Sequence, residues 1–249
     1  MKSLDQLLKI DIDTRAKYLY EEAKKQYKRL DEKYEEFIKF SPYWAYKYAL
    51  NIIKDRWLEA EPYLLKSPEV ALDYTRFIIG ERWPEAEPHI MKSSRWAYYY
   101  AKDVINGRWP EAEPYIMKCK DPIIICKYAH YIIRGKWKEA EKYIIKDPRS
   151  AYYYANYILR RRWIEAEPYI IKNPRCAVEY AKDVLKKRWL EAEPYIMKDP
   201  SYAIDYAKNV MKKRWKEAEP IMQNSIWWYD YQNHFNIKIN REGNSYEIT

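Results

Sequence analysis

The strongest constraint on the fold of this chain is an internal repeat of 26 residues. A basic residue followed by tryptophan recurs seven times, and Glu-Ala-Glu follows each tryptophan at the same offset. The basic residues are Arg56, Arg82, Arg108, Lys136, Arg162, Arg188 and Arg214, so the spacings are 26, 26, 28, 26, 26 and 26. The longer unit carries two additional residues near 119–122, where a loop can absorb them. A fixed period of about 20–50 residues indicates a repeat architecture.

Each repeat predicts two helices. The first is short, as in residues 111–118, and the second opens with a capping residue followed by proline. The side chain of such a cap accepts hydrogen bonds from free backbone amides, and proline at the first helical position lacks only a hydrogen that has no partner there. The cap–proline pairs are Ser67-Pro68, Asp121-Pro122, Asp147-Pro148, Asn173-Pro174 and Asp199-Pro200.

The apolar pattern of the second helix predicts how the repeats pack. Counted from the proline as zero, positions 3, 6, 7, 10 and 11 form one helical face, as in Ala177, Tyr180, Ala181, Val184 and Leu185. One such pair of helices cannot bury this face alone, whereas stacked pairs can. The sequence therefore predicts an all-α protein, an α-solenoid of stacked two-helix repeats.

The repeats divide the chain into three regions. Residues 30–220 predict about seven repeats, of which residues 30–55 are a divergent first unit without the Arg-Trp pair. Residues 1–29 predict an N-terminal capping helix region. Residues 221–249 predict a C-terminal cap, in which the alternation of residues 235–239 is compatible with a short β-hairpin.

Proline also recurs in the first helix. Pro110 lies near the first helical position, and Pro114 follows a turn later. A proline in the interior of a helix costs about 3 kcal/mol. Since Pro114 recurs in six of the seven copies, we expect it to bend or shorten the first helix.

The pattern RWxEAEPYI followed by DPxxAxxYA resembles tandem repeats of uncharacterised bacteriophage and bacterial proteins. It is more loosely similar to HEAT and tetratricopeptide (TPR) solenoids. The resemblance covers roughly residues 56–220 and implies a binding scaffold that a phage could encode. It carries over no functional residues, because such repeats have no assigned site.

The two carboxylates of Glu-Ala-Glu raise the question of acid–base catalysis. Residues two apart on a helix point about 200° apart, so Glu111 and Glu113 cannot both face one substrate. A catalytic site also occurs once, whereas this motif occurs seven times. We therefore interpret the motif as structural, with Arg108 and Glu111 as an ion pair three residues apart.

Other candidates for chemistry are few. Only 4 glycines occur among 249 residues, which argues against Rossmann and P-loop chemistry. Cys119, Cys126 and His130 lack a fourth ligand and match no zinc spacing. The sequence therefore predicts no enzyme, no cofactor, no metal site and no small-molecule substrate.

The positions that differ between copies are candidates for binding a partner. At about 100° per residue, positions 1, 5, 8 and 12 of the second helix point away from the core. In the five repeats that begin at Arg82, these places hold eleven basic and two acidic residues. With two tyrosines at position 5, the basic residues form a set that we call the basic strip. Its members are Arg95, Tyr99, Lys102, Lys127, Arg134, Arg149, Tyr153, Arg160, Arg175, Lys182, Lys186, Lys208 and Lys212.

The basic strip has two interpretations. Its cations suit a phosphate backbone, and its tyrosines can stack on exposed bases. A solvated helix face is also normally charged, and a cation at position 12 favours the helix C-terminus.

A second candidate surface, the aromatic flank, lies at positions 2 and 4 of the second helices. Aromatic side chains are enriched in protein-binding hot spots, and packing between neighbouring repeats is the alternative role for these residues. The flank consists of Trp44, Tyr46, Trp96, Tyr98, Tyr152 and Tyr202. In the C-terminal tail, Trp227 and Trp228 are expected to seal the open end of the solenoid.

These patterns predict a non-catalytic binding module. We expect a protein partner first, for example a host factor that a phage-encoded inhibitor or adaptor engages, and nucleic acid as the alternative. The charge of +9 places any anionic partner in the C-terminal half, because residues 130–249 hold 23 basic and 16 acidic residues. The three cysteines, the absence of a signal-like start and the lack of a long apolar run predict a cytoplasmic chain without membrane contact.

Overall fold

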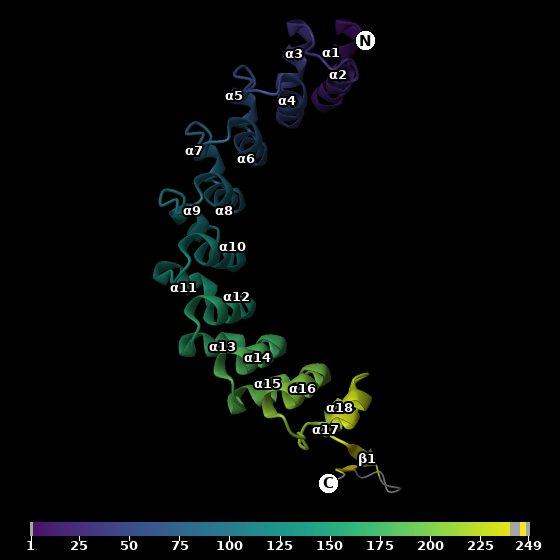
Figure 1. The fold of residues 1–249 in the computed structure, drawn as a ribbon, viewed down its shortest axis with the longest axis vertical. Coiled ribbons are helices and arrows are strands. Elements are labelled where there is room, and N and C mark those ends of the chain that lie inside the picture. The colour runs from purple at the N-terminus through teal and green to yellow at the C-terminus, as the bar shows by residue number, and fades with distance from the viewer. Residues whose placement is uncertain (1, 240–244, 248–249) are drawn as a thin grey trace. The chain divides into compact units, whose positions relative to one another are not determined.

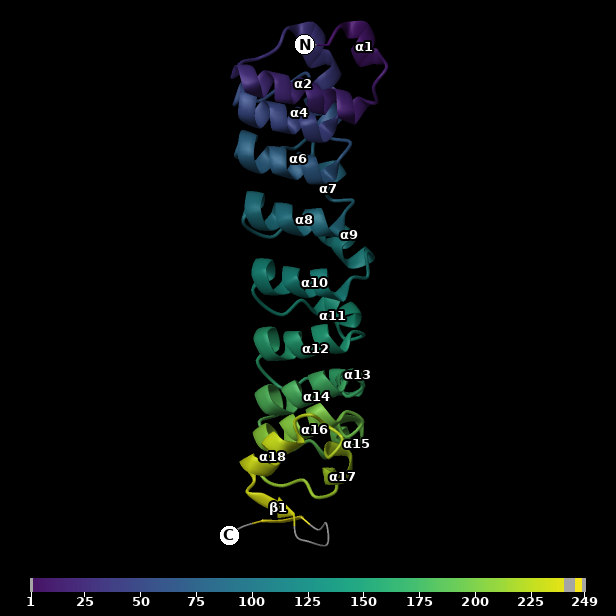
Figure 2. The ribbon, with the colours of Figure 1, turned by 90° about the vertical axis from the view of Figure 1, so that its right-hand side faces the viewer.

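The computed structural model describes residues 2–239 and 245–247 of the chain, and it confirms the all-α repeat architecture. The chain divides into two compact units, residues 1–124 and residues 125–249, and the boundary falls inside helix α10. Each unit is a stack of helix pairs, in which consecutive second helices lie side by side (Figures 1 and 2). Among the described residues, no helix is long and apolar enough to cross a membrane.

The first unit begins with two helices that precede the repeats. Its α-helices are α1 (Leu4–Leu8), α2 (Ile12–Gln26), α3 (Glu32–Lys39), α4 (Pro42–Tyr48), α5 (Glu61–Leu64), α6 (Pro68–Tyr74), α7 (Glu87–Ile90), α8 (Ser94–Tyr100), α9 (Glu113–Lys118) and α10 (Pro122–Tyr128). The π-helices η1 (Ala49–Ile53), η2 (Thr75–Ile79) and η3 (Ala101–Ile105) continue α4, α6 and α8. The single capping helix expected before residue 30 is thus two helices, α1 and α2.

The second unit continues the same alternation. Its α-helices are α11 (Lys138–Ile144), α12 (Pro148–Tyr153), α13 (Glu167–Ile170), α14 (Pro174–Tyr180), α15 (Glu193–Ile196), α16 (Pro200–Tyr206), α17 (Glu219–Met222) and α18 (Trp228–His234). The π-helices are η4 (Ala129–Ile133), η5 (Tyr154–Leu159), η7 (Ala181–Leu185) and η9 (Ala207–Met211), and the 3₁₀ turns are η6 (Ile164–Ala166) and η8 (Leu190–Ala192).

The capping pattern predicted for the second helices is confirmed. Asp147 accepts the amide of Ser150 at 2.7 Å, and Asn173 accepts the amide of Cys176 at 3.1 Å. Pro148 lies in the first turn of α12, where its missing hydrogen would have no partner. Side-chain capping therefore fixes where each of these helices begins.

The second helix does not remain an α-helix to its end. In the first repeat the amide of Lys54 donates to the carbonyl of Ala49, five residues earlier, at 2.7 Å. The residue at position 12 then adopts a left-handed conformation and ends the helix, with φ between 51° and 75°. The constant 100° per residue expected along this helix is therefore wrong beyond position 6, because a π-turn holds more residues than an α-turn.

The first helix shows what its proline does. Pro114 is the second residue of α9, so it lies in the first turn and not in the helix interior. The expected interior penalty of proline therefore does not apply. The copy that has Lys142 in place of proline confirms the shortening: its helix α11 begins at Lys138 and spans 7 residues, whereas α13 and α15, with proline, span 4 residues each. A proline at this place has no hydrogen to donate to the turn before it, which delays the start of the helix.

The core lies between the first and second helices of each repeat. Positions 3, 6 and 7 of the second helix are fully buried, as Ala177, Tyr180 and Ala181 illustrate. Positions 10 and 11, predicted to be core, are only half-buried at Val184 and Leu185. They belong to the π-helix η7, beyond the α-helical part of this second helix.

The helix pairs continue beyond Pro220, where the sequence pattern was expected to stop. Helices α17 and α18 form a last pair, in which Tyr231 takes the place of the buried tyrosine of the other repeats. Strands β1 (Ile237–Ile239) and β2 (Ser245–Glu247) follow and pair in antiparallel fashion. Residues 240–244, which join the two strands, lie outside the described residues.

Candidate nucleic-acid interface

The repeated residues form a hydrogen-bonded network, with a buried tyrosine and glutamate and a partly exposed arginine, that holds each helix pair together. Arg162 donates to Glu167 through two hydrogen bonds, Nε to Oε1 at 2.6 Å and Nη2 to Oε2 at 2.8 Å. The hydroxyl of Tyr180 accepts the backbone amide of Trp163 at 2.8 Å and donates to Glu167 at 3.2 Å. The same tyrosine ring packs on Trp189 of the next repeat, with 5.3 Å between ring centroids. Tyr180 therefore links the second helix to the first helix of its own repeat and also packs against the next repeat.

The ion pair expected between Arg108 and Glu111 of the Glu-Ala-Glu motif is wrong. The bidentate partner of Arg108 is Glu113, at 2.9 and 2.8 Å, in place of the expected Glu111. Glu113 is buried and Glu111 is exposed. The two carboxylates thus lie in different environments, and the second belongs to the scaffold.

The divergent first repeat keeps the network although it lacks an Arg-Trp pair. Arg29 donates to both oxygens of Glu35 at 2.9 and 2.7 Å. Tyr48 accepts the amide of Leu30 at 2.8 Å and donates to Glu35 at 2.7 Å. Arg29 and Leu30 therefore take the places of arginine and tryptophan, a match that the strict motif search missed.

The buried tyrosines predict a loss of stability in alkali. Burial raises the pKa of Tyr206 from its ordinary value of 10 to about 12, and the charge of Glu193 acts in the same direction against the hydrogen bond from Trp189. Because the folded chain holds this proton more tightly than the unfolded chain, the contribution is complete below pH 10 and is lost as the pH rises through 12. We expect the free energy of unfolding, measured by urea titration, to fall by about 2–3 kcal/mol per such tyrosine over this interval.

A pair of variants checks this expectation. Tyr206→Phe removes one titrating group. The free energy of unfolding of this variant should therefore fall less steeply between pH 10 and pH 12 than that of the wild type. Tyr229→Phe should leave the slope as it is, since Tyr229 is 73% exposed. Identical slopes for the two variants would contradict the assignment.

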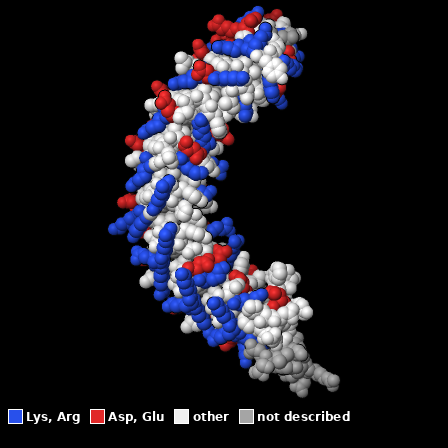
Figure 3. Space-filling view, viewed as in Figure 1, with Lys and Arg blue, Asp and Glu red and all other residues white. Residues whose placement is uncertain are grey.

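The basic strip is divided between the two units. Arg95, Tyr99 and Lys102 lie in residues 1–124, and the other members lie in residues 125–249. The first unit holds 22 basic and 21 acidic residues, whereas the second holds 24 and 16. Figure 3 shows the same difference, with Lys and Arg predominant over the helices from α11 to α15 and mixed signs over α3 to α8. The excess charge of the protein thus belongs to the second unit.

In the first unit the strip has two cations, Arg95 and Lys102, and carboxylates lie close to Lys102 and to Arg76, which stands at the equivalent position 8 of the preceding repeat. Arg76 forms ion pairs with Asp73, at 3.3 Å, and with Asp103 of the next repeat. Lys102 lies 3.9 Å from Asp103, and Arg76 lies over the ring of Tyr99 at 5.6 Å. The carboxylates that surround these side chains leave little net positive charge for a partner.

In the second unit most cations of the strip are exposed and free of carboxylates. Arg175 pairs with Glu179 at 2.9 Å, and Lys208 pairs with Asp230 at 2.6 Å. Among the residues that the structure describes, no carboxylate lies within ion-pair distance of the other strip cations of this unit. These are Lys127, Arg134, Arg149, Arg160, Lys182, Lys186 and Lys212.

The strip continues into residues that the sequence analysis did not include. Position 12 and the residue after it are Arg160-Arg161, Lys186-Lys187 and Lys212-Lys213 in the second unit, and Arg134 stands before Gly135. We call these seven cations the cap row, since they follow the left-handed ends of the second helices. All of them are exposed. Since η4, η5, η7 and η9 pack consecutively, the cap row runs along one edge of the unit.

The backbone of the cap row carries strain that the first unit partly avoids. Position 12 is Gly80 or Asn106 in two repeats of the first unit, residues that tolerate a left-handed conformation. In the second unit it is Arg134, Arg160, Lys186 and Lys212, with φ from 51° to 56°. A cation there interacts favourably with the helix C-terminus. The left-handed backbone conformation is nevertheless unfavourable for a residue with a Cβ atom. A comparison of "RRRW" and "KKRW" with "GERW" and "NGRW" could have found this row.

The aromatic flank packs mainly between helices. Tyr46, Tyr98 and Tyr152 are buried, and Trp44, Trp96 and Tyr202 are half-buried. Tyr152 donates a hydrogen bond of 2.6 Å to Asp183 of the following repeat. This arrangement favours the packing interpretation of the flank over the hot-spot interpretation.

A separate aromatic group was missed. His130, Tyr131, Tyr153 and Tyr157 cluster on the outer surface of η4, α12 and η5, although only Tyr153 belongs to the basic strip. Tyr131 and Tyr157 stand at position 9, which the helical-wheel argument did not examine. The available signal was an aromatic residue at that position, where Asp103, Asp183 and Asn209 stand in other repeats and only Phe77 of the first unit is also aromatic.

Cysteines and acidic groups offer no further site. The thiols of Cys126 and Cys176 are buried, and burial raises their pKa to about 12 and about 11. Within residues 2–239 and 245–247, no group of three or more His, Cys, Asp or Glu side chains is placed to hold a metal ion. Cys119 is exposed.

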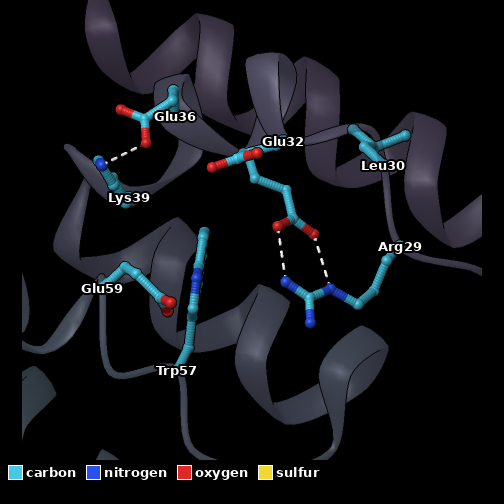
Figure 4. A pocket seen from close by; sticks show the side chains of 8 residues that line it. Arg29, Leu30, Glu32, Glu36, Lys39, Trp57 and Glu59 are labelled. Carbon is cyan, nitrogen blue, oxygen red and sulfur yellow. Dashed lines mark hydrogen bonds and ion pairs between the residues drawn. The ribbon is translucent and has the colours of Figure 1, made fainter.

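A pocket of about 310 Å³ opens between α3 and the loop before α5 (Figure 4). Two ion pairs line it, Arg29 with Glu35 at 2.7 Å and Lys39 with Glu36 at 2.5 Å. Trp57 of the next repeat completes the wall. Glu32 and Glu59 also line the pocket, and its two cations are both engaged in ion pairs of the first repeat's scaffold.

Comparisons with protein-family models, curated proteins and solved structures found no match to this chain. The resemblance to phage and bacterial repeat proteins therefore stays a prediction.

Proposed function

We propose that this chain is a non-catalytic binding module and that its second unit binds nucleic acid through the basic strip and the cap row. What supports the proposal is the concentration of exposed cations on one set of helices and loops. The scaffold does not require these charges, because the first unit builds the same fold with 22 basic and 21 acidic residues. Phosphates spaced along a strand are a natural counterpart for cations that recur from repeat to repeat.

The proposal predicts strong dependence of affinity on salt. Six phosphate contacts would lower the affinity by about a thousandfold between 50 and 200 mM salt, because each contact releases condensed counterions. Fluorescence anisotropy with a labelled 20-nucleotide DNA and the corresponding RNA, titrated at both salt concentrations, measures this slope. An absence of binding at the lower concentration would contradict the proposal.

A protein partner is the second candidate, and one observation favours it. Ile226, Trp227 and Tyr229 are 88%, 53% and 73% exposed at the last helix pair, where aromatic side chains could anchor a protein. Trp228 stacks on Tyr231 at 5.3 Å, and Trp227 lines a pocket with Ile204 and Asp205 of α16. Capture of a protein from nuclease-treated lysate, together with failure of the nucleic-acid titration, would favour this candidate.

A further inference from the structure

The aromatic cluster of His130, Tyr131, Tyr153 and Tyr157 joins two neighbouring second helices of the second unit. The His130 ring lies 4.5 Å from Tyr131, 5.4 Å from Tyr153 and 6.3 Å from Tyr157, each in an edge-on arrangement. The rings of Tyr153 and Tyr157 lie 4.5 Å apart. Contacts from η4 to α12 and η5 therefore make one continuous aromatic surface.

This surface is open to solvent although it is built of large rings. Tyr131 is 47% exposed and Tyr157 is 48% exposed. His130 and Tyr153 are half-buried beneath them. The His130 ring lies between two of these tyrosines and packs edge-on against both Tyr131 and Tyr153. The cluster thus presents ring area in a fixed arrangement.

The scaffold itself does not need aromatic residues here. Positions 8 and 9 are Lys182-Asp183 and Lys208-Asn209 in the other repeats of this unit, and these repeats pack in the same way. In the two repeats of the cluster the same positions are His130-Tyr131 and Asn156-Tyr157. The substitution replaces small polar and charged groups with exposed rings, which gains little for folding.

The two second helices that build the cluster carry charge of one sign, and a carboxylate of the following repeat, Asp183, accepts a hydrogen bond from Tyr152 of α12. No acidic residue occurs between Asp121 and Glu139, or between Asp147 and Glu165, so both second helices and the loops after them lack carboxylates. The same two segments contribute exposed cations of the basic strip and the cap row. They are Lys127, Arg134, Arg149, Arg160 and Arg161. Aromatic faces within a cationic surface are complementary to bases and phosphates of one strand.

We propose that the aromatic cluster is a stacking platform for unpaired bases, so that the partner of the second unit is single-stranded nucleic acid. This inference rests on the proposed function. Bases stack on exposed tyrosine or histidine rings while neighbouring Lys and Arg contact the phosphates, and stacking tolerates any sequence because every base has a flat face. In a duplex the bases are already stacked on one another, and only phosphates remain for this surface to contact.

The test compares two probes and two substitutions. The double variant Tyr131→Ala with Tyr157→Ala should bind a 15-nucleotide oligo(dT) about tenfold or more weakly, because it removes the two exposed rings. Tyr131→Phe with Tyr157→Phe keeps the rings and should bind within about threefold of the wild type. Both variants should bind a 15-base-pair duplex like the wild type, since phosphate contacts are unchanged.

A matched control uses exposed tyrosines of the first helices. Tyr115→Ala with Tyr195→Ala removes rings that are 44% and 37% exposed and should leave binding of oligo(dT) unchanged. Wild-type affinity of the Tyr131 and Tyr157 alanine variant for oligo(dT), or an equal loss for both probes, would overturn the inference. Binding of the duplex without binding of oligo(dT) would overturn it as well and leave the proposed function standing. Failure of every probe would contradict both.

Discussion

Replacement of Lys182, Lys186, Lys208 and Lys212 by glutamate is expected to abolish nucleic-acid binding. Each exposed cation that contacts a phosphate contributes about 1 kcal/mol, so loss of four lowers the affinity by about a thousandfold before repulsion by the new carboxylates is added. The slope of log affinity against log salt should also fall by about four. Anisotropy titration at several salt concentrations measures both quantities.

The control for this variant carries the same change of charge on another surface of the same unit. Lys138, Lys142, Lys146 and Lys172 are exposed cations of the first helices and the loops that follow them, and their replacement by glutamate should weaken binding far less. Because Lys208 pairs with Asp230, a second variant with glutamine in place of glutamate avoids placing two carboxylates together. Equal losses from the two surfaces would show that binding follows net charge and not the basic strip.

Substitution of Trp189 by alanine is expected to lower the free energy of unfolding by several kcal/mol. The side chain is only 4% exposed, and its ring packs on Tyr180 of the preceding repeat at 5.3 Å. Removal of a buried tryptophan leaves a cavity and costs about 3–5 kcal/mol. Since each repeat contacts only its neighbours, the loss should weaken the interface on both sides of helix α15. Urea unfolding followed by circular dichroism measures the change in the free energy of unfolding.

Trp227 provides the comparison for this variant. It is 53% exposed, and its replacement by alanine should change the free energy of unfolding by about 0.5 kcal/mol or less. A similar loss for Trp227 and Trp189 would mean that the tyrosine–tryptophan contacts do not carry the stability of the stack.

Much of the scaffold could be predicted because it depends on local chemistry. The cap–proline pairs place the start of the second helix at Pro148 and Pro174, since a side-chain cap and a proline act within one turn of chain. The repeat of 26 residues identifies equivalent positions, and the fully buried Ala177 and Tyr180 follow from helical spacing. Seven copies of one pattern also confirm each other.

The candidate site was predicted only in part. The π-turn changes the direction in which the residues at the end of the second helix point, and the sequence analysis assumed a regular α-helix there. Helical spacing at 100° per residue placed Lys186 and Lys212 on the outer face of an α-helix, whereas both are left-handed residues after a π-turn. Tyr131 and Tyr157 fall in the equivalent π-turns of two other repeats, η4 and η5, at a position outside the predicted strip. The apolar pattern of so short a helix does not show whether its last hydrogen bonds span four residues, as in an α-helix, or five, as in a π-helix.

By itself the sequence determined that this chain is a stack of helix pairs, where most of those helices begin, and that its positive charge belongs to the second half. Only the tertiary structure decided which carboxylate of "RWPEAEPYIMK" pairs with Arg108, because burial of Glu113 depends on the helix packed against it. It likewise decided that Pro114 begins a short helix and that the exposed cations and rings gather on the second unit. The physical reason is that capping and periodicity act within a few residues, whereas burial, ion pairing and exposure depend on neighbours from the next repeat.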